Sequence, residues 1–191
     1  MALRVPKADL GEVAEAMVEQ FGVVPEPLEV TGHNPAVAAA AQAMGAEVAA
    51  WDAADQSLKT FAHMAVAAQV GCSWCLDYNY FDAQNRHLDL AKASQVPRWR
   101  ESDVFTPRER DVLAYAEAMT ATPPTVTDEL AARLLDHLGP EALVELTAVI
   151  AFANLSTRNN VALGIESQGF SAACAVPLAR RPEASAVASG A

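Results

Sequence analysis

The sequence LKTFAHMAVAAQVGCSWCLDYN, residues 58–79, decides the fold. Its apolar side chains recur at helical spacing, which predicts a helix over about 54–70. Gly71 interrupts this pattern, and a second helix is expected to run from Cys72 to about Ser94, before a proline. The stretch therefore predicts two consecutive helices with a cysteine pair at the point where they meet.

Helical signals continue on both sides of this stretch. Asn34-Pro35 supplies an N-cap and a first-turn proline, and Thr106-Pro-Arg-Glu109 is a capping box. No period-two alternation persists long enough to predict a strand, and residues 21–35, which contain three prolines, predict an irregular arm. Further helices are expected at about 9–20, 35–50, 106–120, 128–138 and 141–165. The expected fold class is all-α.

Composition favours an oligomer of single-domain subunits. The chain has 191 residues, which is the size of one domain. It is 52% hydrophobic but only 6% aromatic, and alanine, a good helix former and a poor core filler, accounts for most of the apolar excess. We therefore expect helices that need a partner subunit.

Charge and cysteine usage restrict the partners and the compartment. The 13 Lys and Arg and 24 Asp and Glu residues give a net charge of −11, which makes nucleic acid or an anionic membrane surface an unfavourable partner. No run reaches the roughly 18 apolar residues of a membrane span, and charges rather than an apolar region follow the first residues. Three cysteines are too few for a secreted disulfide framework, so we expect a cytoplasmic protein.

The Cys72-Ser-Trp-Cys75 spacing requires a chemical explanation. At a helix N-terminus the two thiols face each other, and the partial positive charge there favours a thiolate. A zinc site would need two more ligands, but Cys174 and the four histidines (His33, His63, His87 and His137) form no second pair, so no metal is expected. Two buried structural cysteines are a further alternative. We favour redox chemistry.

The segment 58–79 resembles the core motif of the carboxymuconolactone decarboxylase-like, or alkylhydroperoxidase D-like, superfamily. Similar motifs follow in the same order at residues 99–102, 105–110, 113–118, 143–147, 154–159 and 164–170. The resemblance spans roughly 35–174 and implies a helical bundle around an antiparallel helical hairpin, assembled as trimers or hexamers. With it we divide the chain into an N-terminal helix and arm at 1–33, the family domain at 34–174 and a disordered tail at 175–191.

The resemblance also implies an activity. In the peroxidase members the second cysteine attacks a small hydroperoxide, the first resolves it as a disulfide, and an external dithiol reductant restores the pair without a cofactor. By position, Cys75 would be the peroxidatic thiol and Cys72 the resolving thiol. The function expected from the sequence is therefore an antioxidant, thiol-dependent alkylhydroperoxide reductase with a redox-active disulfide.

The proton relay of that family is substituted here. Its glutamate position is Thr60 and its histidine position is Asn79, and neither side chain titrates near neutral pH. A weak peroxidase activity is therefore expected. His63 lies three residues after Thr60 on the same helix face and is our candidate for a substitute base.

Aromatic and acidic side chains also lie near the pair in the sequence. Trp74, Tyr78 and Phe81 lie at helical spacing and are candidates for a substrate pocket, or for core or subunit packing. Asp77 and Asp82 flank the motif and are expected to be solvated.

Two other functions stay open from the sequence. One is a carboxymuconolactone-type decarboxylase, which would not depend on cysteine. The other is a non-catalytic redox-sensing oligomer that forms a disulfide without turnover.

Overall fold

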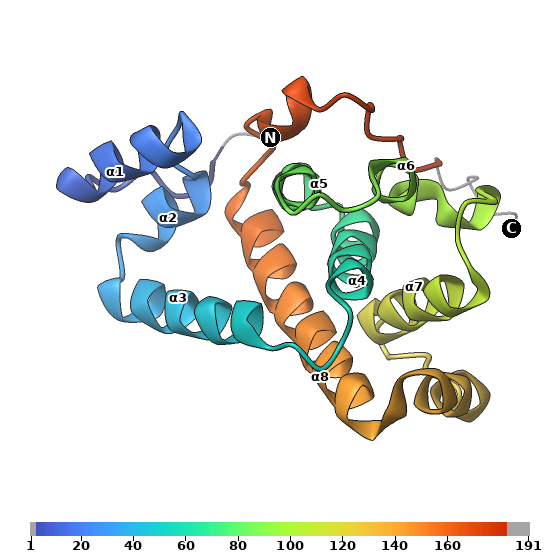
Figure 1. The fold of residues 1–191 in the computed structure, drawn as a ribbon. Helices are drawn as coiled ribbons and strands as arrows, with labels where there is room; N and C mark the ends of the chain where they lie inside the picture. The colour runs from blue at the N-terminus through green and yellow to red at the C-terminus, as the bar shows by residue number, and fades with distance from the viewer. Residues whose placement is uncertain (1–2, 183–191) are drawn as a thin grey trace, which may run out of the picture.

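The structure is a computed structural model that describes residues 3–182, and within these residues every regular element is helical (Figure 1). The α-helices are α1 (Glu12–Phe21), α2 (Glu26–Thr31), α3 (Pro35–Ala50), α4 (Gln56–Val70), α5 (Ser73–Asn85), α6 (Leu90–Ala93), α7 (Pro107–Thr120) and α8 (Asp128–Leu163). Two 3-10 helices, η1 (Val96–Glu101) and η2 (Phe170–Ala173), complete the set. The expected all-α fold class is confirmed.

Helix α4 lies at the centre of the molecule, in contact with α5, α7 and α8 (Figure 1). Phe61 and Met64 on α4 are buried against the core, together with Leu113 of α7 and Leu146 and Ile150 of α8. Burial of such side chains contributes about 1.5–3 kcal/mol each relative to exposure. The apolar face predicted for this segment is therefore part of the hydrophobic core, together with α7 and α8.

Helices α4 and α5 are joined by a tight turn at Gly71. Its φ of 83° lies in the left-handed region that favours glycine, and its N–H donates to the carbonyl of Ala67. The N–H of Cys72 donates to the same carbonyl, and α5 begins at the next residue. The break predicted at Gly71 is confirmed.

Local signals placed several other helix ends correctly. The side chain of Asn34 accepts a hydrogen bond from the N–H of Val37, directly before Pro35. Thr106 and Glu109 form the reciprocal capping box at the start of α7. The break expected at residues 139–140 is a kink inside α8, where Gly139 has a φ of 76°. These are signals that depend only on neighbouring residues.

Two sequence expectations about the helices were wrong. The helix expected from residue 72 to 94 ends at Asn85, because the chain turns at His87, which has a φ of 56°, and Asp89 then caps the short α6. The arm at 21–35, expected to be irregular, contains α2. Neither turn geometry nor this short helix leaves a strong pattern in the sequence.

Helix α8 is, among the described residues, the one helix long and apolar enough to cross a membrane by length and composition. A core helix passes the same test, and α8 packs against α4 and α7. Leu146, Ile150 and Ala153 on its inner face are fully buried. Its apolar character is thus accounted for in part by the core.

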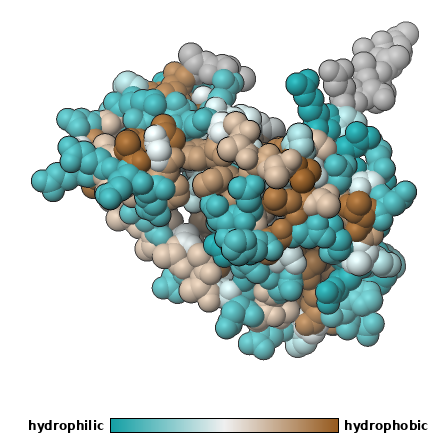
Figure 2. Space-filling model, turned by 45° about the horizontal axis from the view of Figure 1, so that its top comes forward, coloured by the Kyte–Doolittle hydropathy of each residue, from teal (hydrophilic) through white to brown (hydrophobic). Residues whose placement is uncertain are grey.

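The N-terminal helices α1 to α3, with the arm at 21–35 between α1 and α3, extend away from the core (Figure 1). No residue of α3 is buried, although Gly45 brings its backbone close to the ring of Phe152 on α8. The side chain of Gln168 holds the arm, accepting from the N–H of Glu26 and donating to the carbonyl of Val24. On the face seen in Figure 2 the surface is hollowed between the arm and the rest of the molecule.

The end of the chain differs from the expected disordered tail. Tyr80 donates to the carbonyl of Val176, the N–H of Ala179 donates to Ser94, and Arg181 donates to the carbonyl of Ala68. Residues 175–182 are therefore held against α4, α5 and α6. The remainder of the expected tail, 183–191, lies outside the described residues.

Candidate active site

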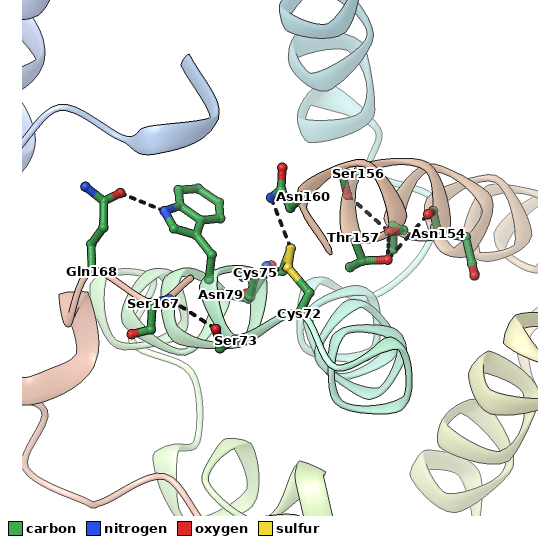
Figure 3. The surroundings of a disulfide bond; sticks show 12 residues. Cys72, Ser73, Cys75, Asn79, Asn154, Ser156, Thr157, Asn160, Ser167 and Gln168 are labelled. Carbon is green, nitrogen blue, oxygen red and sulfur yellow. Dashed lines mark hydrogen bonds between the residues drawn. A yellow bond between two sulfur atoms is a disulfide. The ribbon is translucent and has the colours of Figure 1, made fainter. Parts of the chain in front are cut away.

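The cysteine pair is a buried disulfide at the N-terminus of α5 (Figure 3). Cys72 is the N-cap residue and Cys75 lies in the first turn, so their Cα atoms are 5.3 Å apart. Their exposed fractions are 1% and 2%. Ala67, Trp74, Leu76 and Val161 pack around them as an apolar cluster. The pair expected from the spacing is thus present, in its oxidised form.

Each sulfur atom of the pair accepts one hydrogen bond from a nitrogen. The N–H of Cys75 donates to Sγ of Cys72 at 3.2 Å. The side-chain amide of Asn160, on α8, donates to Sγ of Cys75 at 3.3 Å (Figure 3). Both donors favour negative charge on the sulfur that they face. Sequence analysis did not identify Asn160, because it lies 85 residues from Cys75 along the chain.

A cavity of about 360 Å³ lies one helical turn from the disulfide, between α3, α4, α5 and α8. Thr60, His63 and Asn79, the three positions singled out by the relay argument, all line it. Neither cysteine lines it, but the side chain of Asn79 donates to the carbonyl of Cys75 at 2.7 Å. The structure therefore brings the relay positions together beside the pair.

The chemistry of His63 is set by burial, which lowers its pKa to about 4. At neutral pH the imidazole is therefore uncharged, and it holds a proton less strongly than an ordinary histidine. Among the described residues it makes no hydrogen bond and contacts no carboxylate that would raise its basicity. A neutral hydrogen-bonding group fits this environment better than a strong base does.

The charged side chains that line the cavity are already paired. Lys59 contacts Glu145 at 2.9 Å, and both are almost fully buried. Burial raises the pKa of Glu145, but the hydrogen bonds from Lys59 and the N–H groups of Ala53 and Ala54 outweigh it, so the pKa is lowered. Arg86 contacts Asp82 at 2.6 Å. The remaining wall includes Val149 and Phe152, so the cavity combines apolar walls with neutral polar groups.

The aromatic pocket candidates pack mainly against one another. Trp74 stacks on Tyr78 with ring centroids 5.0 Å apart, and both meet the ring of Phe170 edge-on. Phe81 also contacts Phe170, at 6.0 Å. Of the three candidates, Tyr78 lines the cavity, whereas Trp74 and Phe81 do not. The cluster joins α5 to the C-terminal segment.

Asp77 is buried, contrary to the expectation that it is solvated. Its carboxylate accepts hydrogen bonds from both the hydroxyl and the N–H of Ser171, from the hydroxyl of Ser167 and from the N–H groups of Gly169 and Phe170. Burial raises its pKa, but these hydrogen bonds outweigh that effect and lower it. Asp77 thus fixes the loop 167–171 on α5. No local pattern could have indicated this role.

Cys174 is a free, partly buried cysteine that packs against the core. Burial and the negative charge of Asp77 raise the pKa of its thiol. It is therefore a poor source of thiolate near neutral pH.

Several solved structures share this fold. Debrominase Bmp8 superimposes with a TM-score of 0.78 at 23% identity, covering 91% of this chain and 96% of Bmp8. An alkylhydroperoxidase AhpD core protein, a peroxidase-related protein from Ralstonia eutropha JMP134, gives a TM-score of 0.76 at 20% identity, covering 88% and 94%. The fold is therefore that of the AhpD core proteins.

Sequence comparison gives the family. The carboxymuconolactone decarboxylase family matches residues 35–118. Protein YnjA of Escherichia coli (strain K12) is 38% identical over 123 residues, 64% of this chain and 66% of YnjA. Protein YdfG of Bacillus subtilis (strain 168) is 30% identical over 100 residues, 52% of this chain and 68% of YdfG. The aligned region spans about two thirds of each relative. The chain belongs to the carboxymuconolactone decarboxylase family.

The half-buried imidazole of His63 predicts a pH dependence of stability. His63 has a lower pKa folded, about 4, than unfolded, about 6.5, so between these values only the unfolded chain binds the proton. The free energy of unfolding should fall with falling pH, by up to about 1.4 kcal/mol per pH unit. His63→Gln should flatten this slope in urea titrations between pH 6.5 and 5, and exposed His137→Gln should leave it in place. Equal slopes in both variants would contradict the assignment.

The Asp77 carboxylate should be important for the C-terminal loop. In Asp77→Asn, an NH₂ group replaces one of the two oxygens that accept hydrogen bonds from the loop 167–171. Donors would then face donors, so we expect a loss of about 2–3 kcal/mol in the free energy of unfolding. Faster hydrogen exchange in residues 167–171 should accompany it. The matched change Asp82→Asn breaks a partly exposed pair with Arg86 and should cost less than about 1 kcal/mol. Equal losses in the two variants would show that the buried contacts are not special.

Proposed function

We propose that the protein is a thiol-dependent hydroperoxide reductase that uses Cys72 and Cys75. The observation that carries this proposal is the buried disulfide whose two sulfurs each face an N–H donor at the start of α5. Family membership and the peroxidase-related structures of the same fold support it. The proposed compartment is the cytoplasm, where dithiol reductants are available.

The proposed reaction needs no cofactor. The thiolate of Cys75 attacks the distal oxygen of ROOH, the O–O bond breaks, and RO⁻ leaves and takes a proton to give ROH. The thiol of Cys72 then attacks the sulfenic acid of Cys75, which forms the disulfide and releases water. An external dithiol reduces the disulfide by exchange and is itself oxidised to a disulfide.

The cavity defines the expected speed and substrate class of this reaction. Thr60 and Asn79 offer hydrogen bonds but no titratable proton, and His63 is uncharged at neutral pH. We therefore propose a slow peroxidase in which His63 orients the substrate rather than acting as a strong base. Apolar walls with internally paired charges suit a small neutral organic hydroperoxide.

The same pair can supply electrons for a second candidate reaction, reductive dehalogenation. Bmp8 is a debrominase, and a cysteine variant of it has been crystallised with 2,3,4-tribromopyrrole. The dithiol supplies two electrons and two protons: both electrons and one proton convert a carbon–bromine bond to carbon–hydrogen, bromide and the second proton are released, and a disulfide forms. The apolar side of the cavity, formed by Val149 and Phe152, favours a ring of this kind.

The two functions left open by sequence are less well supported. A decarboxylase would bind an anionic lactone, but Lys59 and Arg86 in the cavity are already paired with carboxylates. A non-catalytic sensor would form the disulfide once and would not turn over. Turnover with a dithiol reductant separates the sensor from the enzyme.

We also propose that the subunits associate, as trimers or hexamers. Helix α8 exposes Val144 and Leu155, with exposed fractions of 70% and 54%, and α3 exposes Val37 and Met44. Large apolar side chains on two long helices are suited to a subunit interface.

Removal of the nucleophile tests the proposed reaction. Cys75→Ser should abolish dithiol-dependent consumption of cumene hydroperoxide, because serine is not an effective nucleophile at neutral pH. Cys174→Ser, which changes the free thiol outside the pair, should retain the rate. Full activity of Cys75→Ser would refute the thiol mechanism. Bromide release from a brominated pyrrole, without peroxide consumption, would support the second candidate instead.

Charge on the exposed faces tests the proposed association. The double variant Val144→Asp and Leu155→Asp should sediment as a monomer, because each carboxylate would have to be buried without a partner. Val104→Asp, at an exposed apolar residue between η1 and α7, should sediment as the unchanged protein does. If all three proteins sediment as monomers, the proposed association is wrong.

A further inference from the structure

The contact between Asn160 and Cys75 is a side-chain hydrogen bond to the disulfide that the steps of the proposed reaction do not yet use. Asn160 projects from α8, its exposed fraction is 8%, and its amide nitrogen lies 3.3 Å from Sγ of Cys75 (Figure 3). The neighbouring contacts of the pair are apolar or come from the backbone. Asn160 is therefore the side chain positioned to act on the reactive sulfur.

The environment of Cys75 makes a donor of this kind necessary. Its side chain is buried among Ala67, Leu76 and Val161, and removal from water disfavours the thiolate. Neither Thr60 nor Asn79 can take the thiol proton, and His63 holds a proton weakly. A fixed amide N–H donor stabilises negative charge without accepting a proton. An asparagine can thus compensate in part for the absent base.

We propose that Asn160 stabilises the thiolate of Cys75 in the reduced protein and is a catalytic residue of the proposed reductase. This inference rests on the proposed function for its role in turnover. The amide lowers the pKa of the Cys75 thiol and raises the fraction present as the nucleophile. Its carrier helix, α8, is held in the core by Leu146 and Ile150, so the donor is fixed in place.

The same hydrogen bond gives a direction to disulfide reduction. A thiolate of the external dithiol attacks Sγ of Cys72, forms a mixed disulfide with it, and displaces the Cys75 thiolate as the leaving group. A stabilised leaving thiolate departs faster. The second thiol of the reductant then attacks the reductant's first sulfur, which is bonded to Sγ of Cys72. This releases the Cys72 thiolate and leaves the reductant as a disulfide. Asn160 therefore acts on the same sulfur in both half-reactions.

Titration of a single thiol tests the proposal without a peroxide. In the full-length Cys72→Ser, Cys174→Ser background, Cys75 is the one remaining thiol, and serine is a good N-cap for α5. The ultraviolet absorbance of the thiolate is followed against pH. Asn160→Leu should raise the pKa of Cys75 by about one unit, a tenfold lower thiolate fraction at a fixed pH below the pKa. Asn159→Leu, at the neighbouring exposed position, should leave it unchanged.

The isosteric change Asn160→Asp provides a second test in case the leucine variant does not fold. It removes the donors, adds negative charge, and should raise the pKa of Cys75 further. An unchanged pKa in either folded Asn160 variant would overturn the proposal. A raised pKa would support stabilisation of the Cys75 thiolate by Asn160 even if the unchanged protein consumed no hydroperoxide. In that case the catalytic role would fail with the proposed function, which is a separate result.

Discussion

The reversal of the chain at Gly71 is the constraint on which the rest of the structure depends. Its positive φ ends α4 and leaves Cys72 to cap α5, so that the sulfur of Cys72 faces the N–H of Cys75. Any other residue at this position would adopt that backbone conformation only with strain. Because α4 is also the centre of the core, the turn fixes the pair relative to α7 and α8. Gly71 thus links the core helix α4 directly to the cysteine pair at the start of α5.

The helices that the sequence predicted well are those with local end signals. Asn34 and Thr106 cap the N-termini of α3 and α7 through hydrogen bonds within one turn of the chain. The helix expected to reach residue 94 was too long, because the proline at 97 supplied the expected stop whereas the turn at His87 has no comparable signal. Residues 175–182 were expected to be disordered because their composition is weakly apolar, but single hydrogen bonds to the core hold them. A local turn ended α5 early, whereas tertiary contact holds residues 175–182.

The residues of the candidate site also fall into those that the sequence predicts and those that depend on tertiary packing. Spacing identified the cysteine pair, the family resemblance singled out Thr60 and Asn79, and helical periodicity added His63; these three positions line one cavity. Periodicity carries such information because neighbours on a helix share a face. It carries none about Asn160, whose contact with the pair depends on how α8 packs. Nor does it predict that burial makes His63 a weak base.

The position of α3 has a consequence for access to the site. One wall of the cavity, at Gly45, Val48 and Ala49, belongs to a helix without a buried side chain, whereas the opposite walls belong to the core. Elements with little buried surface open at a lower free energy than the whole protein does. A molecule that binds in the cavity only while α3 is in place raises the free energy of local opening of this helix. Occupancy of the cavity and local opening of residues 35–50 are therefore thermodynamically linked, and a molecule can exchange while the core stays folded.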